Sequence, residues 1–257
     1  MPMNTRNLSF IYRSKRFSPH KEQDDRNILE AVARQAQAAG ATVTFFEEDE
    51  FSPHPQCDLI FSMAREDRTL DLLKTMEQKN VLVINPPDSV RACRKSFIEQ
   101  VMKRHAIPHP DRDTGHGWWI KRGDSAAAQD RGDVIFCKDN DELEERRKIF
   151  RQRGITDFIV QPHVPGTHVK FYGIAGTGFF RYFLHQEKGS MGHVKDFQQS
   201  LYGATEALAS LINIKVYGGD AIVQADGSFK IIDFNDWPSF SPCRQEAAKA
   251  IWKLALK

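Results

Sequence analysis

Residues 219–235 carry the strongest structural signal in this chain and read GDAIVQADGSFKIIDFN. Two apolar runs, 219–224 and 229–235, predict β-strands, and Asp226-Gly227 between them predicts a two-residue hairpin loop. With that loop, Asp220 lies opposite Asp233, with the two Cβ atoms roughly 5 Å apart. Like charges that face each other destabilise a sheet, so we expect a cation between the two carboxylates.

The chemistry of this hairpin favours a hard metal ion. Asn235 follows Asp233 by two residues and therefore lies on the same face of its strand. Two carboxylates and an amide oxygen suit Mg²⁺, which usually also binds substrate phosphates. The alternative is a solvated acidic edge with one carboxylate protonated or turned away. A register shift of one residue would still leave Asp233 and Asn235 on one face.

The overall composition narrows the class of protein. The chain has 257 residues, enough for two subdomains around one or two cores. Its 36 basic and 34 acidic residues nearly balance, so the basic face of a nucleic-acid binder is not expected. No apolar run approaches membrane-spanning length, and residues 1–6 lack the apolar region of a signal peptide.

The four cysteines are scattered along the chain without paired spacing. They read as free thiols of a reducing compartment, not as a disulfide framework or a zinc site. We therefore expect a cytoplasmic protein. The cysteines are Cys57, Cys93, Cys137 and Cys243.

The N-terminal part predicts a parallel α/β sheet, because strands alternate with helices. The predicted strands are 8–12, 42–46, 58–63 and 81–85, with helices at 24–39 and 66–78. No Gly-x-Gly-x-x-Gly motif occurs, so dinucleotide binding has no support.

The rest of the chain predicts three further units. Residues 86–117 form a linking helix, which runs to about 105, and a loop. Residues 118–165 form a small lid-like unit of three strands and one helix. Residues 166–257 form a C-terminal unit with antiparallel strands that contains the acidic hairpin. The fold class is therefore α/β with an α+β C-terminal part, and the domains are 1–85, 86–117, 118–165 and 166–257.

This order of elements, together with Asp220 and the segment 231–238 (IIDFNDWP), resembles the ATP-grasp superfamily. That superfamily includes D-alanine ligase, glutathione synthetase, the ribosomal-protein glutamate ligases and the inositol phosphate kinases. The resemblance covers roughly 85–257, and the N-terminal unit fits the usual leading domain. It implies that Asp220, Asp233 and Asn235 bind Mg²⁺ against the phosphates of ATP. Many relatives have Glu at the position of Asp233.

The resemblance also implies phosphate-binding residues. Lys121 ends a predicted strand just before a loop of small residues, 123–128, where relatives have a phosphate-binding lysine and a loop that closes over the phosphates. Lys95 lies in the helix after Pro86-Pro87, where relatives have a basic residue near the nucleotide. Arg91 and Arg94 are neighbouring candidates, and a solvated helix face is the alternative.

Two further segments resemble nucleotide contacts of the superfamily. Residues 161–164 resemble the hinge that binds adenine through backbone groups, and Pro162 has no N–H to donate, so neighbours such as Val164 must supply it. Lys170 resembles a basic residue that lies over the nucleotide, although His168 shares its face of the strand. The hinge residues are Gln161, Pro162, His163 and Val164.

Three segments are candidates for the substrate side. In relatives, the stretch after the metal strand lines the acceptor or the transferred phosphate, here Ser239, Ser241 and Arg244, although helix-start hydroxyls also serve as caps. Basic loops follow the first and third strands, at the carboxyl edge where open α/β sheets bind ligands. These loops suggest an anionic substrate, with a solvated surface as the alternative. Their residues are Arg13, Arg16, Arg65 and Arg68.

The resemblance implies an ATP-dependent carboxylate–amine ligase that works through an acylphosphate. Lys121, Lys170 and Arg244 are the expected catalytic residues, ATP and Mg²⁺ the cofactors, and a small anionic molecule and an amine the partners. A small-molecule kinase similar to the inositol phosphate kinases is the first alternative. A non-catalytic nucleotide-binding protein is the second. We expect neither a nucleic acid nor a membrane as partner.

Overall fold

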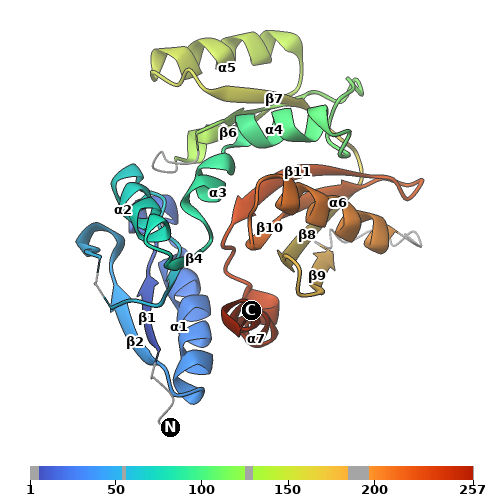
Figure 1. The fold of residues 1–257 in the computed structure, drawn as a ribbon. Helices are drawn as coiled ribbons and strands as arrows, with labels where there is room; N and C mark the ends of the chain where they lie inside the picture. The colour runs from blue at the N-terminus through green and yellow to red at the C-terminus, as the bar shows by residue number, and fades with distance from the viewer. Residues whose placement is uncertain (1–5, 54–55, 125–129, 185–196, 257) are drawn as a thin grey trace.

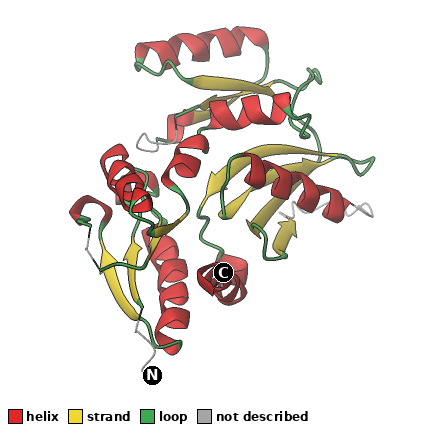
Figure 2. Cartoon of the chain, viewed as in Figure 1, coloured by secondary structure: helices red, strands yellow, loops and turns green. Residues whose placement is uncertain are grey.

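The structure is a computed structural model that describes residues 6–53, 56–124, 130–184 and 197–256. The described elements form three units around separate sheets, with the N-terminal sheet, the small subdomain and the C-terminal sheet visible in Figure 1. Figure 2 shows helices beside each of these sheets. No helix within these ranges is long and apolar enough to cross a membrane.

The N-terminal unit is a parallel four-stranded sheet, as the alternation of strands and helices predicts. Its strands lie in the order β2-β1-β3-β4. Apolar side chains of α1 pack on one face, including Ile28, Leu29 and Val32, which are almost fully buried. The elements are β1 (Asn7–Ile11), α1 (Glu22–Ala38), β2 (Thr42–Phe46), β3 (Leu59–Ser62), α2 (Asp67–Gln78) and β4 (Leu82–Ile84).

The C-terminal helix belongs to the same core. Helix α7 (Arg244–Trp252) packs beside α1, and its buried Ala247 and Ile251 share one apolar cluster with Phe10 and Phe61 of the N-terminal sheet. Figure 1 shows the two helices side by side. The last helix of the chain therefore ties the C-terminal unit to the N-terminal one.

The linking segment contains two helices, not the single helix that the sequence predicts. Helix α3 (Pro87–Ala92) ends before Arg94, whose extended backbone separates it from α4 (Lys95–Arg104). The Lys95 N–H donates to the Gly123 carbonyl at 2.9 Å, so the second helix starts against the small subdomain. This tertiary contact explains the break, which local propensity does not reveal.

The small subdomain is an antiparallel three-stranded sheet in the order β6-β5-β7, covered by one helix. Its strands are β5 (Trp118–Arg122), β6 (Val134–Cys137) and β7 (Phe158–Pro162). Helix α5 (Asn140–Gln152) is capped by Asp139, whose side chain accepts from the Glu142 N–H at 2.9 Å. Buried Leu143 and Phe150 attach the helix to the sheet.

The C-terminal sheet is antiparallel in the order β11-β10-β8-β9. Its strands are β8 (Thr167–Ile174), β9 (Phe179–Leu184), β10 (Val216–Val223) and β11 (Phe229–Asp236). Helix α6 (Phe197–Leu211) packs on one face, where Leu201 and Leu208 meet Phe171, Ala221 and Phe234. Residues that alternate with these apolar side chains point to the opposite face.

The hairpin has the expected pairing of Asp220 with Asp233, but not the expected loop. Val223 pairs with Phe229, and the Gln224 N–H donates to the Ser228 carbonyl at 2.8 Å, so the loop contains three residues with Gly227 at φ +84°. The two-residue prediction is wrong, and pairing near the loop is displaced by one. A β-bulge beside Asp220 shifts the register back.

Candidate functional site

Asp220 and Asp233 lie directly opposite each other in the middle of the β10–β11 hairpin. They occupy the face of the C-terminal sheet that α6 leaves uncovered, because their neighbours Ala221 and Phe234 are buried under that helix. Asn235 lies on the same face, and its Nδ2 donates to Asp233 Oδ2 at 2.7 Å. The structure thus brings together the three predicted metal ligands.

Cations surround the Asp233 carboxylate. Lys95, at the first position of α4, forms an ion pair with Asp233 Oδ1. Burial by itself would raise the pKa of Asp233, but Lys95 and Lys121 outweigh it and lower that pKa well below the usual range. The carboxylate is therefore ionised at neutral pH and needs a cation next to it.

Asp220 faces basic side chains of the neighbouring strand. His168 Nε2 lies 2.8 Å from Asp220 Oδ1, and Lys170 Nζ lies 3.8 Å from the same oxygen. Lys170 is the direct cross-strand partner of Asp220. The two candidates that share a face of β8, His168 and Lys170, thus both lie at the acidic pair.

Lys121 connects the small subdomain with the hairpin. Its Nζ donates to Gln161 Oε1 at 2.8 Å and to the Ile232 carbonyl at 2.9 Å. Ile232 is the extra residue of the β-bulge, so the bulge supplies the acceptor. Burial lowers the pKa of Lys121 to about 8, against the opposing attraction of Asp233. A lysine with such a pKa can change charge near neutral pH.

The residues fit a hard divalent ion. Among the described residues no group of three or more His, Cys, Asp or Glu is arranged to bind a metal, so an ion here would use two carboxylates and the Asn235 amide oxygen. Asp233 is ionised and faces Asp220 across the ladder, and oxygen donors of this kind suit Mg²⁺. Lys95 is the cation next to Asp233 in the structure.

The predicted adenine hinge spans the end of β7 and the two residues after it. The His163 N–H donates to the Gly117 carbonyl at 2.8 Å, and the His163 carbonyl accepts from Thr114 Oγ1 at 2.6 Å. The Val164 N–H makes no hydrogen bond within the described residues, so it is the donor that a ligand could use. Gln161 binds Lys121 with its side chain, and Pro162 ends the strand.

An open cavity of about 660 Å³ adjoins the hinge at the tip of the hairpin. Val164, Phe197 and Lys230 line it, together with part of the linker between α4 and β5. None of the three predicted metal ligands lines this cavity. The predicted phosphate loop cannot be placed relative to it, because residues 125–128 lie outside the described residues.

The residues after β11 gather at the start of α7. Ser239 Oγ and Ser241 Oγ are 2.9 Å apart, and Arg244 Nη2 lies 3.4 Å from Ser241 Oγ. The same nitrogen donates to Asp24 Oδ1 of α1 at 3.0 Å. The three candidates for the substrate side thus form one cluster, which also contacts the N-terminal unit.

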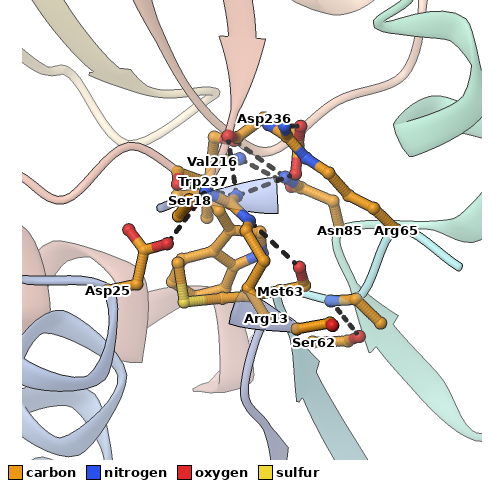
Figure 3. Close-up of polar contacts among 12 residues, drawn as sticks. Arg13, Ser18, Asp25, Ser62, Met63, Arg65, Asn85, Val216, Asp236 and Trp237 are labelled. Atoms are coloured by element: carbon orange, nitrogen blue, oxygen red, sulfur yellow. Dashed lines mark hydrogen bonds and ion pairs between the residues drawn. The ribbon is translucent and has the colours of Figure 1, made fainter. Parts of the chain in front are cut away.

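The basic loops of the N-terminal sheet have partners that the sequence did not reveal. Arg13 and Arg65 both bind the buried carboxylate of Asp236, as Figure 3 shows, whereas Arg16 is half exposed and pairs with Glu66. Burial lowers the pKa of Arg65, but Asp236 more than offsets this and raises it. Arg68 donates to the Asp49 carbonyl. Sequence reasoning missed Asp236, although an acid directly after the Asp-x-Asn pattern was a visible signal.

Comparison with known proteins shows the fold. No family model matches the sequence, and no curated protein sequence matches it either. The structure of the D-alanine–D-alanine ligase from Coxiella burnetii matches with a TM-score of 0.69 at 13% identity, covering 95% of this chain and 91% of that chain. The D-alanine–D-alanine ligase from Bacillus anthracis, complexed with ATP, matches with a TM-score of 0.65 at 12% identity, covering 98% and 100%.

A third similar structure is the ATP-grasp ligase PsnB complexed with a minimal precursor. It matches with a TM-score of 0.63 at 13% identity and covers 99% of this chain and 100% of that chain. These likenesses extend over nearly the whole chain, so the expected architecture, a parallel N-terminal α/β unit followed by antiparallel sheets, is confirmed.

Proposed function

We propose that this chain, which has the ATP-grasp fold, is an ATP-dependent carboxylate–amine ligase that acts through an acylphosphate intermediate. The observation that carries the proposal is the facing pair Asp220 and Asp233, with Asn235 beside them and Lys95, Lys121 and Lys170 around them. Acidic residues surrounded by lysines suit a metal-bound triphosphate, because carboxylates bind the metal ion and ammonium groups bind the phosphates.

In this proposal, Asp220, Asp233 and Asn235 would bind Mg²⁺, which would neutralise phosphate charge. Lys95, which pairs with Asp233 in the structure, would bind a phosphate oxygen instead. Lys121 and Lys170 stabilise the charge that develops on the transferred γ-phosphoryl group. Lysine suits this exchange, because its ammonium is a point charge on a flexible stem.

The nucleotide base would lie at the hinge 161–164. The Val164 N–H is the donor that supports this placement, since Pro162 has none and the His163 N–H is bonded to Gly117. Gln161 would not bind the base, because its side-chain oxygen accepts a hydrogen bond from Lys121. The hinge therefore connects base binding with the position of a phosphate-binding lysine.

The acid substrate would bind beside Ser239, Ser241 and Arg244, with Arg16 as a further cation at the N-terminal unit. A carboxylate oxygen of the substrate attacks the γ-phosphorus, the bond to the β-phosphate oxygen breaks, and ADP leaves. The amine then attacks the acyl carbon and displaces inorganic phosphate. Arg244 would stabilise negative charge on the substrate. No protein nucleophile is needed.

The test is a substrate screen with Mg²⁺ and ATP. Pools of carboxylic acids and amines are incubated with the purified protein, ADP and inorganic phosphate are measured, and products are identified by mass spectrometry. A ligase releases both ADP and phosphate, and only when acid and amine are present together. A stable phosphorylated product formed without an amine would contradict the proposal and identify a kinase.

A further inference from the structure

The carboxyl ends of three parallel N-terminal strands meet the β10–β11 hairpin at its open end. Arg13 follows β1, Arg65 follows β3 and Asn85 follows β4. All three side chains converge on Val216, Asp236 and Trp237, as Figure 3 shows. In open α/β sheets this edge is where ligands bind, but here another part of the same chain occupies it.

Two arginines share the Asp236 carboxylate. Arg65 Nη2 lies 2.6 Å from Asp236 Oδ1, and Arg13 Nη2 lies 3.2 Å from Asp236 Oδ2. Arg13 also donates to the Trp237 carbonyl at 3.0 Å and to Asp25 at 3.1 Å. The Asp236 side chain is 1% exposed. Buried charges persist only when they are paired, so these groups hold one another in place.

Asn85 binds the partner strand in the manner of a short β-ladder. Its Oδ1 accepts from the Lys215 and Val216 N–H groups at 3.0 and 2.7 Å, and its Nδ2 donates to the Val216 carbonyl at 2.8 Å. The Trp237 N–H donates to the same carbonyl at 3.1 Å. The first residue of β10 and the residue after β11 are thus tied to the N-terminal sheet together.

Glu48 holds the two arginine loops together. It is buried, and its carboxylate accepts from the backbone N–H groups of Ser14, Arg65 and Glu66. Ser14 and Arg65 belong to the loops after β1 and β3. The two guanidinium groups therefore come from loops with a fixed separation, which suits a positioning role.

The open end of the hairpin lies next to Asn235, one of the three predicted metal ligands. Asn235 directly precedes Asp236, so movement of Asp236 moves the predicted metal ligand next to it. Strand β11 is at the edge of its sheet and has a strand partner only in β10 within the described residues. Contacts with the N-terminal unit consequently contribute much of what fixes its last residues.

We propose that Arg13, Arg65 and Asn85 are positioning residues that clamp the end of β11 and so set where Asn235 and Asp233 lie relative to the lysines. They act through Asp236 and Val216 and touch neither nucleotide nor substrate. The link to nucleotide binding rests on the proposed function, whereas the link to the position of β11 does not. In this role the two arginines do not bind an anionic substrate.

The test combines two measurements on Asp236→Asn. Backbone hydrogen exchange over 233–237 and 215–217 should become about tenfold faster, with the small-subdomain sheet unchanged. Affinity for Mg²⁺ with a nonhydrolysable ATP analogue, measured by calorimetry, should fall about tenfold, as for supports of metal ligands, while affinity for the metal-free analogue stays the same.

The matched control is Glu246→Gln, which removes an acid from the exposed pair with Arg181 and should change neither measurement. Should Asp236→Asn not fold, Arg13→Gln keeps the Arg65–Asp236 pair and should give a smaller change of the same kind. If Asp236→Asn leaves hydrogen exchange unchanged, the clamp is overturned. If the wild type binds the Mg²⁺–analogue complex and the variant shows faster exchange with the same affinity, the positioning role is overturned. A wild type that binds no analogue contradicts the proposed function alone, and exchange then decides the clamp.

Discussion

Strand β11 carries two aspartates three residues apart, and the surroundings of their carboxylates differ. Asp233 has lysines, with Lys95 on the carboxylate and Lys121 nearby, and its pair with Lys95 is about one quarter exposed. Asp236 has the arginines Arg13 and Arg65 and is almost fully buried. In both cases the cations outweigh the burial that would raise the pKa of the aspartate, so both pKa values lie below the usual range.

Under the proposed function, the difference between the partners separates an exchangeable site at Asp233 from a permanent one at Asp236. A lysine ammonium is a point charge on a flexible stem and can give way to a metal ion or move to a phosphate. Arginine is planar, always charged and directional, which suits fixed pairing in a buried place. Under the proposed function, Asp233 on one face of β11 would exchange Lys95 for a metal ion, whereas Asp236 attaches the strand to the N-terminal unit.

The largest expected effect concerns the exchangeable site. Asp233→Asn should lower kcat for Mg²⁺-dependent ATP turnover about 1000-fold, because a neutral amide cannot offset metal charge. Steady-state kinetics measure this, and far-UV circular dichroism should remain that of the wild type. Asp226→Asn, on the exposed loop of the same hairpin, is the control and should keep full activity. Equal kcat in the two variants would contradict the role of Asp233.

The next effect concerns the permanent site. Asp236→Asn should lower the free energy of unfolding by about 3 kcal/mol, since it leaves two buried guanidinium groups without their carboxylate. Urea denaturation followed by fluorescence measures this. The exposed control Glu246→Gln should cost less than about 1 kcal/mol. If Asp233→Asn destabilised the protein as much as Asp236→Asn does, the contrast between the two carboxylates would be broken.

The pH dependence of activity distinguishes the lysines around Asp233 from the arginines around Asp236. Burial lowers the pKa of Lys121 to about 8, so its ammonium loses its proton as pH rises through that value. If Lys121 binds phosphate as proposed, that binding should then weaken. We expect kcat/KM for ATP to fall about tenfold per pH unit above that point. Lys121→Arg should remove this fall up to pH 10, as an arginine stays charged. A wild-type profile that stays flat from pH 7 to 10 would exclude Lys121 as the source of phosphate-binding charge.

The smallest effect tests whether a metal can replace Lys95. Without Mg²⁺, Lys95→Gln should lower the free energy of unfolding by about 1 kcal/mol, because Asp233 loses its ion pair. Saturating Mg²⁺ should abolish most of this difference. Lys103→Gln, on the same helix, removes the ion pair between the exposed Lys103 and the buried Glu99 and serves as the control. A loss that Mg²⁺ does not restore would show that Lys95 is not exchangeable.

Much of the architecture could be predicted from the sequence. Short apolar runs revealed the strands of all three sheets, since such runs are a local property of the sequence. The break between α3 and α4 could not be predicted, because it follows from the contact of Lys95 with Gly123. The inclusion of α7 in the N-terminal core likewise depends on a partner helix more than 200 residues earlier in the chain.

The hairpin shows how a correct pairing can follow from an incorrect loop. The two-residue loop predicted Asp220 opposite Asp233, and the three-residue loop alone would have shifted the register by one. The bulge at Ile232 restores the pairing and turns the Ile232 carbonyl toward Lys121. That bulge is visible only in the tertiary structure of the hairpin.

The amino-acid sequence by itself determined that Asp220, Asp233 and Asn235 share a face and that basic residues follow the N-terminal strands, because spacing along a strand is a local property. The tertiary structure decided which cations each carboxylate meets. Lys95 lies 138 residues from Asp233, and Arg65 lies 171 residues from Asp236. Such ion pairs form only after separate units of the fold have docked. The burial of each pair then determines whether a ligand can reach its carboxylate.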